Sequence, residues 1–284
     1  MIGFLLALTS CNPNYDMPGM FNGSSVRADQ RFDESMAYNK KAGYSHIVAP
    51  EDYRIYVCTD THIDSTTYNL SSFVKAYKSD PRCRFAIHLG DLINAKGNYP
   101  RFFEAMAVNP AGYVQGKDTV FYTPGNHDLY FNQWEVYKTY IPNSTYWFDT
   151  RTADGKLLDL YVCLDSGEGT LGENALAWLR QTLQELSKEE YRHRIVFTHT
   201  HMFKKDDSQG HTSNYSMEET YDLTALFSQY HIDMYWSGHD HSREISNYSG
   251  VTYIVVDALE DPTKQPYYMV VDMDKEIHVA FEKP

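Results

Sequence analysis

The chain has 284 residues, of which 42% are hydrophobic, 15% aromatic and 22% charged, a composition typical of globular proteins and unlike disordered, collagen or coiled-coil chains. Lys and Arg number 25 against 38 Asp and Glu, so the formal net charge is −13. This charge disfavours nucleic-acid binding through a basic surface, but not binding of a small anion through metal ions.

The N-terminal segment is apolar and ends in small residues and a cysteine. Leu8-Thr9-Ser10-Cys11 resembles the lipobox of bacterial lipoproteins, in which the cysteine is lipidated and the preceding segment is removed. Residues 1–11 are therefore expected to be a lipoprotein-type signal segment, with a buried N-terminal strand as the alternative. The protein would then be exported to a bacterial cell envelope, as a periplasmic or surface lipoprotein anchored to the membrane at Cys11.

Residues 12–43 are predicted to be a tether and N-terminal extension. The segment from Asn12 to about Asp29 is polar, contains proline and glycine, and shows no hydrophobic period. Asp33 to Ala42 is weakly helical in pattern. Ordered structure is expected to begin near Tyr44, so that residues 44–284 form a single catalytic domain.

Short apolar runs alternate with helical segments from Tyr53 onward. The expected strands are Tyr53–Thr59, Arg84–Leu89, Thr119–Thr123, Trp147–Phe148, Leu158–Leu164, Arg194–Thr198, Ile232–Ser237, Val251–Val256, Tyr267–Val271 and Ile277–Phe281. The expected helices are Leu70–Tyr77, Phe102–Met106, Asn174–Leu186 and Tyr221–Tyr230. This order predicts a mixed α/β domain with two packed mixed β-sheets and helices outside, a four-layer α/β/β/α sandwich.

Five of the strands are followed by turns that carry metal-ligand side chains. These turns are Asp60-Thr61-His62, Gly90-Asp91-Leu92-Ile93-Asn94, Gly125-Asn126-His127-Asp128, Thr198-His199-Thr200-His201 and Gly238-His239-Asp240-His241. Ligand crevices in α/β sheets lie beyond the carboxyl ends of the strands, so the five turns should converge on one site. Imidazole, carboxylate and amide ligands without cysteine suit Mn, Fe or Zn.

Together, the five motifs resemble the signature of the calcineurin-like metallophosphoesterase family, from about Asp60 to His241. The resemblance implies a dinuclear site of divalent metal ions at the carboxyl ends of the strands. It assigns one metal ion to Asp60, His62, Asp91 and His241, and the second to Asp91, Asn126, His199 and His239. Asp91 would bridge the two ions, and His127 would face the leaving group.

The chemistry expected of such a site is hydrolysis of a phosphoester. Two metal ions roughly 3.5 to 4 Å apart lower the pKa of a water molecule, giving an activated hydroxide, and polarise the phosphoryl oxygens. Two divalent ions with the carboxylates of Asp60 and Asp91 leave roughly +2 at the centre, so an acidic protein can bind a phosphoryl group. The expected partner is a small phosphorylated substrate, with no nucleic-acid polymer.

Other side chains in the motifs have structural alternatives. His127 is interpreted as the proton donor to the leaving alkoxide, and its alternative is a role in its own turn. Asp128 either orients an imidazole or caps the following turn. His88 is expected to be a core histidine, and Asp240 to be solvated.

Two features depart from the family pattern. His201 stands where members usually have proline, and it is either a support or donor at the site or a tolerated turn substitution. Lys204 to Glu218 is a polar insertion with His211 and Tyr215, interpreted as a mobile loop over the site or as a surface excursion.

The residues also separate this chain from one branch of the family. Purple acid phosphatases resemble it but carry tyrosine at the position of Asn94 and glycine at the position of His62. A phosphodiesterase acting on small substrates is therefore favoured, with a phosphomonoesterase as the rival. An idle phospholigand-binding module is a weaker alternative because all the expected ligands are present, and a nuclease lacks the required basic surface.

Overall fold

The computed structural model describes residues 27–108, 120–203, 215–261 and 266–284. The signal segment and Cys11 lie outside these residues. One sheet has seven strands in the order β1 (Ser45–Val48), β5 (Tyr146–Arg151), β6 (Leu157–Cys163), β7 (His193–Phe197), β8 (Met234–Ser237), β10 (Val251–Val255) and β9 (Glu244–Tyr248). The other has five, in the order β12 (Ile277–Glu282), β11 (Tyr268–Met273), β2 (Tyr53–Cys58), β3 (Cys83–His88) and β4 (Val120–Tyr122).

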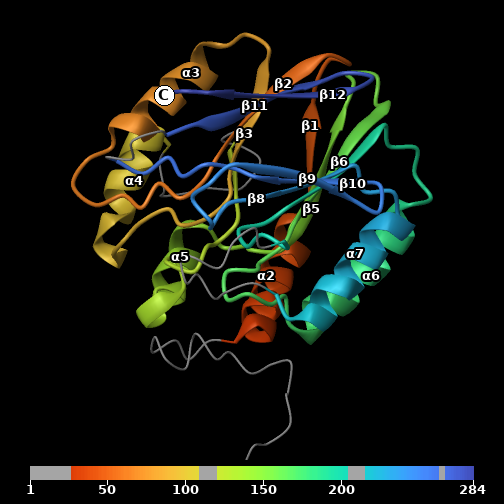
Figure 1. The fold of residues 1–284 in the computed structure, drawn as a ribbon, viewed down its shortest axis with the longest axis horizontal. Helices are drawn as coiled ribbons and strands as arrows, with labels where there is room; N and C mark the ends of the chain where they lie inside the picture. Colours follow the sequence, from red (N-terminus) through yellow and green to blue (C-terminus); the bar gives the residue numbers. More distant parts are fainter. Residues whose placement is uncertain (1–26, 109–119, 204–214, 262–265) are drawn as a thin grey trace, which may run out of the picture.

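The sheets are packed face to face with helices outside. Helices α3 (Tyr68–Ser79), α4 (Tyr99–Met106) and α5 (Trp134–Tyr140) cover the five-stranded sheet, and α2 (Ala28–Ala42), α6 (Glu173–Leu186) and α7 (Met217–Gln229) cover the seven-stranded sheet. Figure 1 shows α3 and α4 on one side of the strands and α6 and α7 on the other. One apolar cluster lies beneath the helices on each outer face, and a third lies between the sheets and contains side chains of both. The four-layer α/β/β/α prediction is confirmed.

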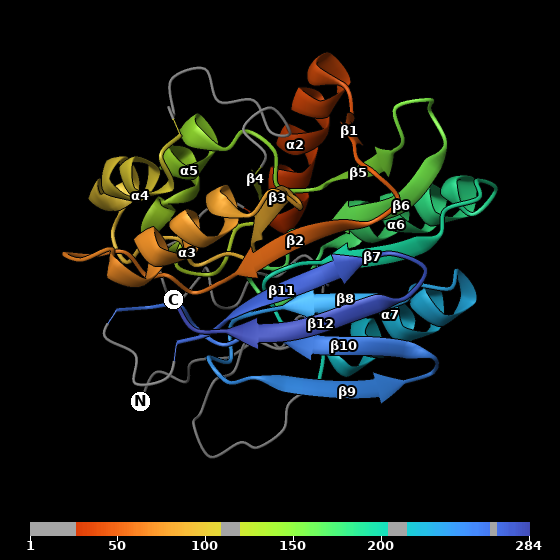
Figure 2. The same ribbon diagram turned by 90° about the horizontal axis from the view of Figure 1, so that it is seen from above.

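Both sheets are mixed. Strands β2, β3 and β4 run parallel to one another, as do β6, β7, β8 and β10. Antiparallel pairs form between β5 and β6, β9 and β10, β11 and β12, and β11 and β2. Figure 2 shows β1 and β9 at opposite edges of the larger sheet. The parallel strands bring the turns that follow β2, β3, β4, β7 and β8 to one end of the sandwich.

The prediction that order begins near Tyr44 is wrong. Helix α2 starts at Ala28 and packs against the seven-stranded sheet through Phe32. Its Arg31 is fully buried and forms ion pairs of 2.9 Å with Asp165 and 2.7 Å with Glu168, in the turn after β6. Much of the expected tether region is thus part of the packed domain.

Strands β1 and β9 and helix α5 were not predicted, and several elements, among them β5, α4 and α7, were predicted too short. Strands β1 and β9 are edge strands with mostly exposed or half-buried residues, and α5 is a short aromatic helix. Helix α7 begins four residues before Tyr221, after a turn in which Ser216 Oγ accepts a hydrogen bond from Glu219 N. The loop predicted to extend through Glu218 therefore ends earlier. No helix within the described residues is long and apolar enough to span a membrane.

Replacing Arg31 with methionine is expected to lower the free energy of unfolding by about 3 to 5 kcal/mol, because Asp165 and Glu168 would remain buried without their cation. The measurement is urea denaturation at constant metal loading. Arg180→Met, which removes an exposed ion pair with Asp222, is the control and should cost at most about 1 kcal/mol. Equal losses in the two variants would contradict the role given to Arg31.

Candidate metal centre

The predicted ligands converge at the carboxyl ends of five strands. Asp60 and His62 follow β2, Asp91 follows β3, Asn126 follows β4, His199 follows β7, and His239 and His241 follow β8. All are buried except His241, whose side chain is 40% exposed. The donor atoms of Asp60, His62 and His241 lie within 4.8 Å of one another, as do those of Asp91, His199 and His239.

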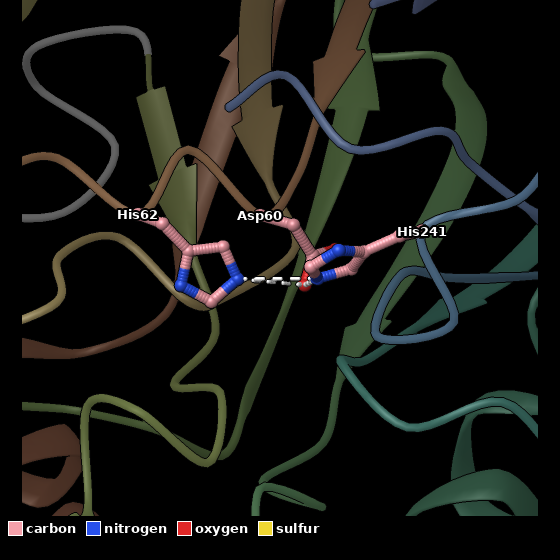
Figure 3. A group of neighbouring side chains, drawn as sticks. All are labelled: Asp60, His62 and His241. Atoms are coloured by element: carbon pink, nitrogen blue, oxygen red, sulfur yellow. Dashed lines mark hydrogen bonds and ion pairs between the residues drawn. The ribbon is translucent and has the colours of Figure 1, made fainter. Parts of the chain in front are cut away.

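The first cluster is arranged around one carboxylate oxygen. Asp60 Oδ1 lies 3.2 Å from His241 Nε2 and 3.7 Å from His62 Nε2, and the two imidazole nitrogens are 3.2 Å apart. Figure 3 shows both rings directed at Asp60 from separate loops. The other oxygen, Asp60 Oδ2, accepts hydrogen bonds from Thr59 Oγ1 at 2.6 Å and His239 N at 2.9 Å. These bonds hold the carboxylate with Oδ1 facing the imidazoles.

The second cluster is centred on His199. Its Nδ1 lies 2.8 Å from the Leu89 carbonyl oxygen and donates to it, which leaves Nε2 to face the cluster. Nε2 lies 3.0 Å from Asn126 Oδ1 and 3.2 Å from His239 Nδ1. Asn126, which belongs to the predicted second ligand set, is therefore in place.

Asp91 lies between the clusters. Its Oδ2 is 3.5 Å from His62 Nε2 and also 3.5 Å from His199 Nε2. Its Oδ1 accepts a hydrogen bond of 2.8 Å from the backbone nitrogen of His127. One carboxylate oxygen is thus positioned equally between donors of both clusters, as a bridging ligand requires.

The chemistry of the donor atoms fits metal ions. Ligand atoms each about 2.1 Å from one ion lie roughly 3 Å apart, close to the separations within each cluster. Asp60 Oδ1 is buried and makes no hydrogen bond with the described residues. A buried carboxylate oxygen without a donor is costly, and a cation would satisfy it.

The backbone at the ligands adopts an uncommon conformation. Asp60, His62, Asp91, His239 and His241 all have positive φ, between 41° and 72°. Residues other than glycine are strained at positive φ, and such strain is concentrated at functional sites. Close approach adds a further constraint, because a Cβ on Gly125 would overlap the carboxylate of Asp91.

The charges of the clusters are balanced between acids and imidazoles. Burial would lower the pKa of His62, but its close contact with the Asp60 carboxylate and the charges of Asp91 and Asp60 raise it to about 9. Burial would raise the pKa of Asp60, but His241 and His62 hold it well below its usual value. Burial lowers the pKa of His239 to about 3, so this imidazole is neutral at pH 7.

The affinity of the metal-free protein for Mn²⁺ is expected to rise about tenfold per pH unit from pH 7 to 9, because His62 must lose its proton to act as a ligand. The sign follows from the raised pKa: the proton competes with the metal below about pH 9 and is absent above it. Metal titrations at several pH values, with proton release recorded, measure this slope. His62→Asn should flatten it and exposed His278→Asn should not. A pH-independent affinity would contradict the prediction.

The structure separates the roles of His127 and Asp128. The His127 ring lies 4.5 Å from the His62 ring, and its donor atoms are close enough to those of His62 and Asp91 to form a third possible ligand group. Asp128 is fully buried and accepts hydrogen bonds from Gly125 N, Leu92 N and Tyr99 Oη. Its bonds therefore support the turn-capping alternative, and none within the described residues reaches an imidazole.

The remaining predicted residues are placed as follows. His88 is buried, and its Nε2 and Nδ1 bond to Thr61 Oγ1 and Gly90 N, as expected of a core histidine. His201 is 2% exposed and stacks on the ring of His239, at 5.8 Å. Asp240 is half-buried and accepts from Ser242 Oγ, outside both clusters. His211 lies outside the described residues, whereas Tyr215 is buried and contacts Tyr235.

Supporting residues in the centre could not be foreseen from the motifs. Thr59 orients Asp60, and Ser166 Oγ accepts a hydrogen bond from Thr200 N, beside His199. Ser166 belongs to the same turn as Asp165, which Arg31 binds. Helix α2 is thereby connected to the backbone that carries His199.

A family model for the calcineurin-like phosphoesterases matches residues 53–243. Among solved structures, a dimetal phosphatase from Danio rerio has a TM-score of 0.59 at 10% identity, over 81% of this chain and 96% of that chain. GAP50, the anchor in the inner membrane complex of Plasmodium, has a TM-score of 0.56 at 16% identity, over 82% of this chain and 84% of that chain. A purple acid phosphatase from yellow lupin (Lupinus luteus) has a TM-score of 0.59 at 14% identity, over 84% of this chain and 54% of that chain.

At such identities the solved structures establish the shared fold, and no curated protein matches the sequence. The family model extends over more than half of the chain and includes every predicted ligand from Asp60 to His241. Together with two adjoining clusters of metal-ligand side chains, this shows that the chain belongs to the calcineurin-like phosphoesterase family and is a metal-dependent phosphoesterase.

Proposed function

We propose that the enzyme hydrolyses small phosphodiesters, with phosphomonoesters as the rival substrates. The observation that carries the proposal is a cavity of about 620 Å³ beside the metal centre, with His62 in its wall. A diester has a second substituent on phosphorus, and this cavity offers space for it next to the ligands. Asn94 also lines the cavity and belongs to neither ligand cluster.

The chain's own residues account for binding and proton transfer. Divalent ions held by the two ligand clusters would supply an activated water and polarise the phosphoryl oxygens. Asp91 lies between the two ligand clusters, with its Oδ2 at 3.5 Å from both His62 and His199. Thr59 orients the carboxylate of Asp60. His127, whose backbone is fixed by bonds to Asp91 and Gln133, donates a proton to the leaving oxygen. Asp128 is a positioning residue that joins the turns after β3 and β4.

The proposed metals are Mn, Fe or Zn in the divalent state. The ligand clusters contain imidazole, carboxylate and amide groups without a thiolate or phenolate, a set from which bound metal should be removable by a chelator. Chelation should abolish activity and Mn²⁺ should restore it. A purple protein as isolated, or undiminished turnover after metal is shown to be absent, would overturn the ligand assignment.

The substrate proposal is tested with bis(p-nitrophenyl) phosphate and p-nitrophenyl phosphate at equal metal loading. The leaving group is the same, so the comparison isolates the second substituent. The expected result is a higher kcat/KM for the diester. A strong preference for the monoester would overturn the diesterase proposal in favour of its rival.

We further propose that the protein is a bacterial envelope lipoprotein anchored at Cys11, with a small phosphorylated substrate as its partner. The support is the string Leu8-Thr9-Ser10-Cys11 and the polar segment after it. Lipidation buries acyl chains at about 0.8 kcal/mol per CH₂, which anchors stably with more than one chain. Fractionation of the full-length chain in its host is the test. A Cys11→Ser variant that remains with the membrane would overturn the anchor.

A further inference from the structure

The cavity beside His62 has an acidic wall. Its lining is formed by the turns after β2 and β3, the start of α3 and the segment after β10, namely Thr61, His62, Asp64, Ser65, Thr66, Tyr68, Asn69, Asn94, Glu260 and Asp261. Among the residues that the structure describes, this lining contains three carboxylates and neither lysine nor arginine. Arg101 donates to the backbone oxygen of Asp64 and lines a neighbouring cavity with Glu104 instead.

Two of the carboxylates are available to a ligand. Asp261 accepts hydrogen bonds from Tyr68 N at 2.6 Å and Asn69 N at 3.0 Å, which engages both of its oxygens at the start of α3. Within the described part of the chain, Glu260 takes part in hydrogen bonding only through its backbone oxygen, which accepts from Asn69 Nδ2. Asp64 is exposed, and its side chain has no partner within the described residues.

Two further observations indicate that the cavity accommodates one portion of the substrate. His62 has a side chain only 4% exposed, and its Nδ1 is buried without a hydrogen-bond partner in the described residues. His62 also belongs to the lining of the cavity, together with Glu260. The cavity and the first ligand cluster therefore share the side chain of His62.

We propose that the cavity binds a cationic substituent of the substrate, an ammonium or quaternary ammonium group attached to the phosphoester through an alcohol. The proposal rests on the proposed function and names its substrate class. The metal centre attracts the phosphoryl anion but repels a neighbouring cation, and Glu260 and Asp64 offset that repulsion. Tyr68 is 75% exposed, and its ring offers a face for a cation. The same charges disfavour substrates with additional anionic groups, such as polyphosphates.

The test compares p-nitrophenyl phosphorylcholine with p-nitrophenyl 3,3-dimethylbutyl phosphate, a neutral analogue of the same shape and leaving group. The wild-type enzyme should favour the choline ester in kcat/KM by about tenfold, and the double variant Glu260→Gln with Asp64→Asn should reduce this ratio to about one to three. Glu276→Gln, an exposed acid at the opposite end of β11, is the control and should leave the ratio unchanged. A wild-type ratio near one, or a ratio unaffected by the double variant, would overturn the proposal.

Failure of the diesterase proposal is recognised separately, by absent turnover of bis(p-nitrophenyl) phosphate. In that case phosphocholine and 3,3-dimethylbutyl phosphate are compared as ligands of the Mn²⁺-loaded protein by calorimetry. Tighter binding of phosphocholine, lost in the double variant, supports the cationic subsite. Equal binding of the two ligands overturns it.

Discussion

Replacing Asp91 with alanine is expected to lower kcat/KM by at least about 10³-fold, and to be the most damaging change of any single ligand. Its Oδ2 lies 3.5 Å from imidazole nitrogens of both clusters, so its loss removes a ligand from each. Two metal ions without a shared anion repel each other. Each loss of about 1.4 kcal/mol of transition-state stabilisation slows the reaction roughly tenfold, so a loss of several kcal/mol gives the expected defect. Elemental analysis and steady-state kinetics on the same preparation measure both effects.

Asp240 provides a matched control for this variant. It lies in the chain between His239 and His241 and belongs to neither cluster, so Asp240→Asn should keep both metals and nearly full activity. A second control is Asp60→Ala, which should remove a ligand from the first cluster alone. If Asp91→Ala bound two metals per chain as the wild type does, Asp91 could not be the bridging ligand.

The ligands were predictable from the sequence because their signals are local. Each lies in a short polar turn directly after a buried strand, and parallel strands direct such turns to one end of a sheet. The same reasoning predicted the layers, since buried strands and amphipathic helices such as α6 carry clear periodicity. The positions of Asp60, Asp91 and His199 relative to one another follow from strand order.

Elements with weak local signals were missed. Strand β9 lies at a sheet edge and has only half-buried or exposed residues, including the exposed Ile245, whereas its partner β10 is mostly buried. The weakly helical pattern from Asp33 to Ala42 is confirmed by helix α2, but the start of this helix at Ala28 and its packing on the sheet were not predicted, because they depend on Arg31 meeting Asp165, 134 residues away. An arginine in a polar segment is normally solvated, so sequence alone gave no reason to expect it in the core.

The supporting contacts of the site depend on distant pairs in the same way. Thr59 is adjacent to Asp60, but its role depends on the direction of its hydroxyl, which no motif encodes. Ser166 contacts Thr200 from 34 residues away. The acidic wall of the cavity joins Asp64 to Glu260, nearly 200 residues further along the chain, and only the antiparallel return of β11 beside β2 explains why these segments meet.

Replacing His127 with alanine is expected to retain both metals but slow the hydrolysis of an alkyl phosphoester by about 10² to 10⁴-fold, with a smaller defect for an activated phenol ester. An alkoxide needs a proton as it leaves, whereas p-nitrophenolate does not. Burial lowers the pKa of His127, so its protonated fraction falls as the pH rises towards neutrality. The wild-type rate with the alkyl ester should therefore decline over that range, and the variant should lack this decline.

The competing role for His127 is that of a third ligand beside His62 and Asp91, which their mutual distances permit. The two roles predict different losses. A ligand variant loses metal and slows both esters equally, whereas a proton-donor variant keeps its metal and slows mainly the ester with the poorer leaving group. Elemental analysis of His127→Ala and the ratio of its two rate defects decide between them, and equal defects accompanied by metal loss would reject the proton-donor role. Its backbone bonds to Asp91 and Gln133 do not involve the imidazole, so the substitution should leave the turn in place and report on the side chain alone.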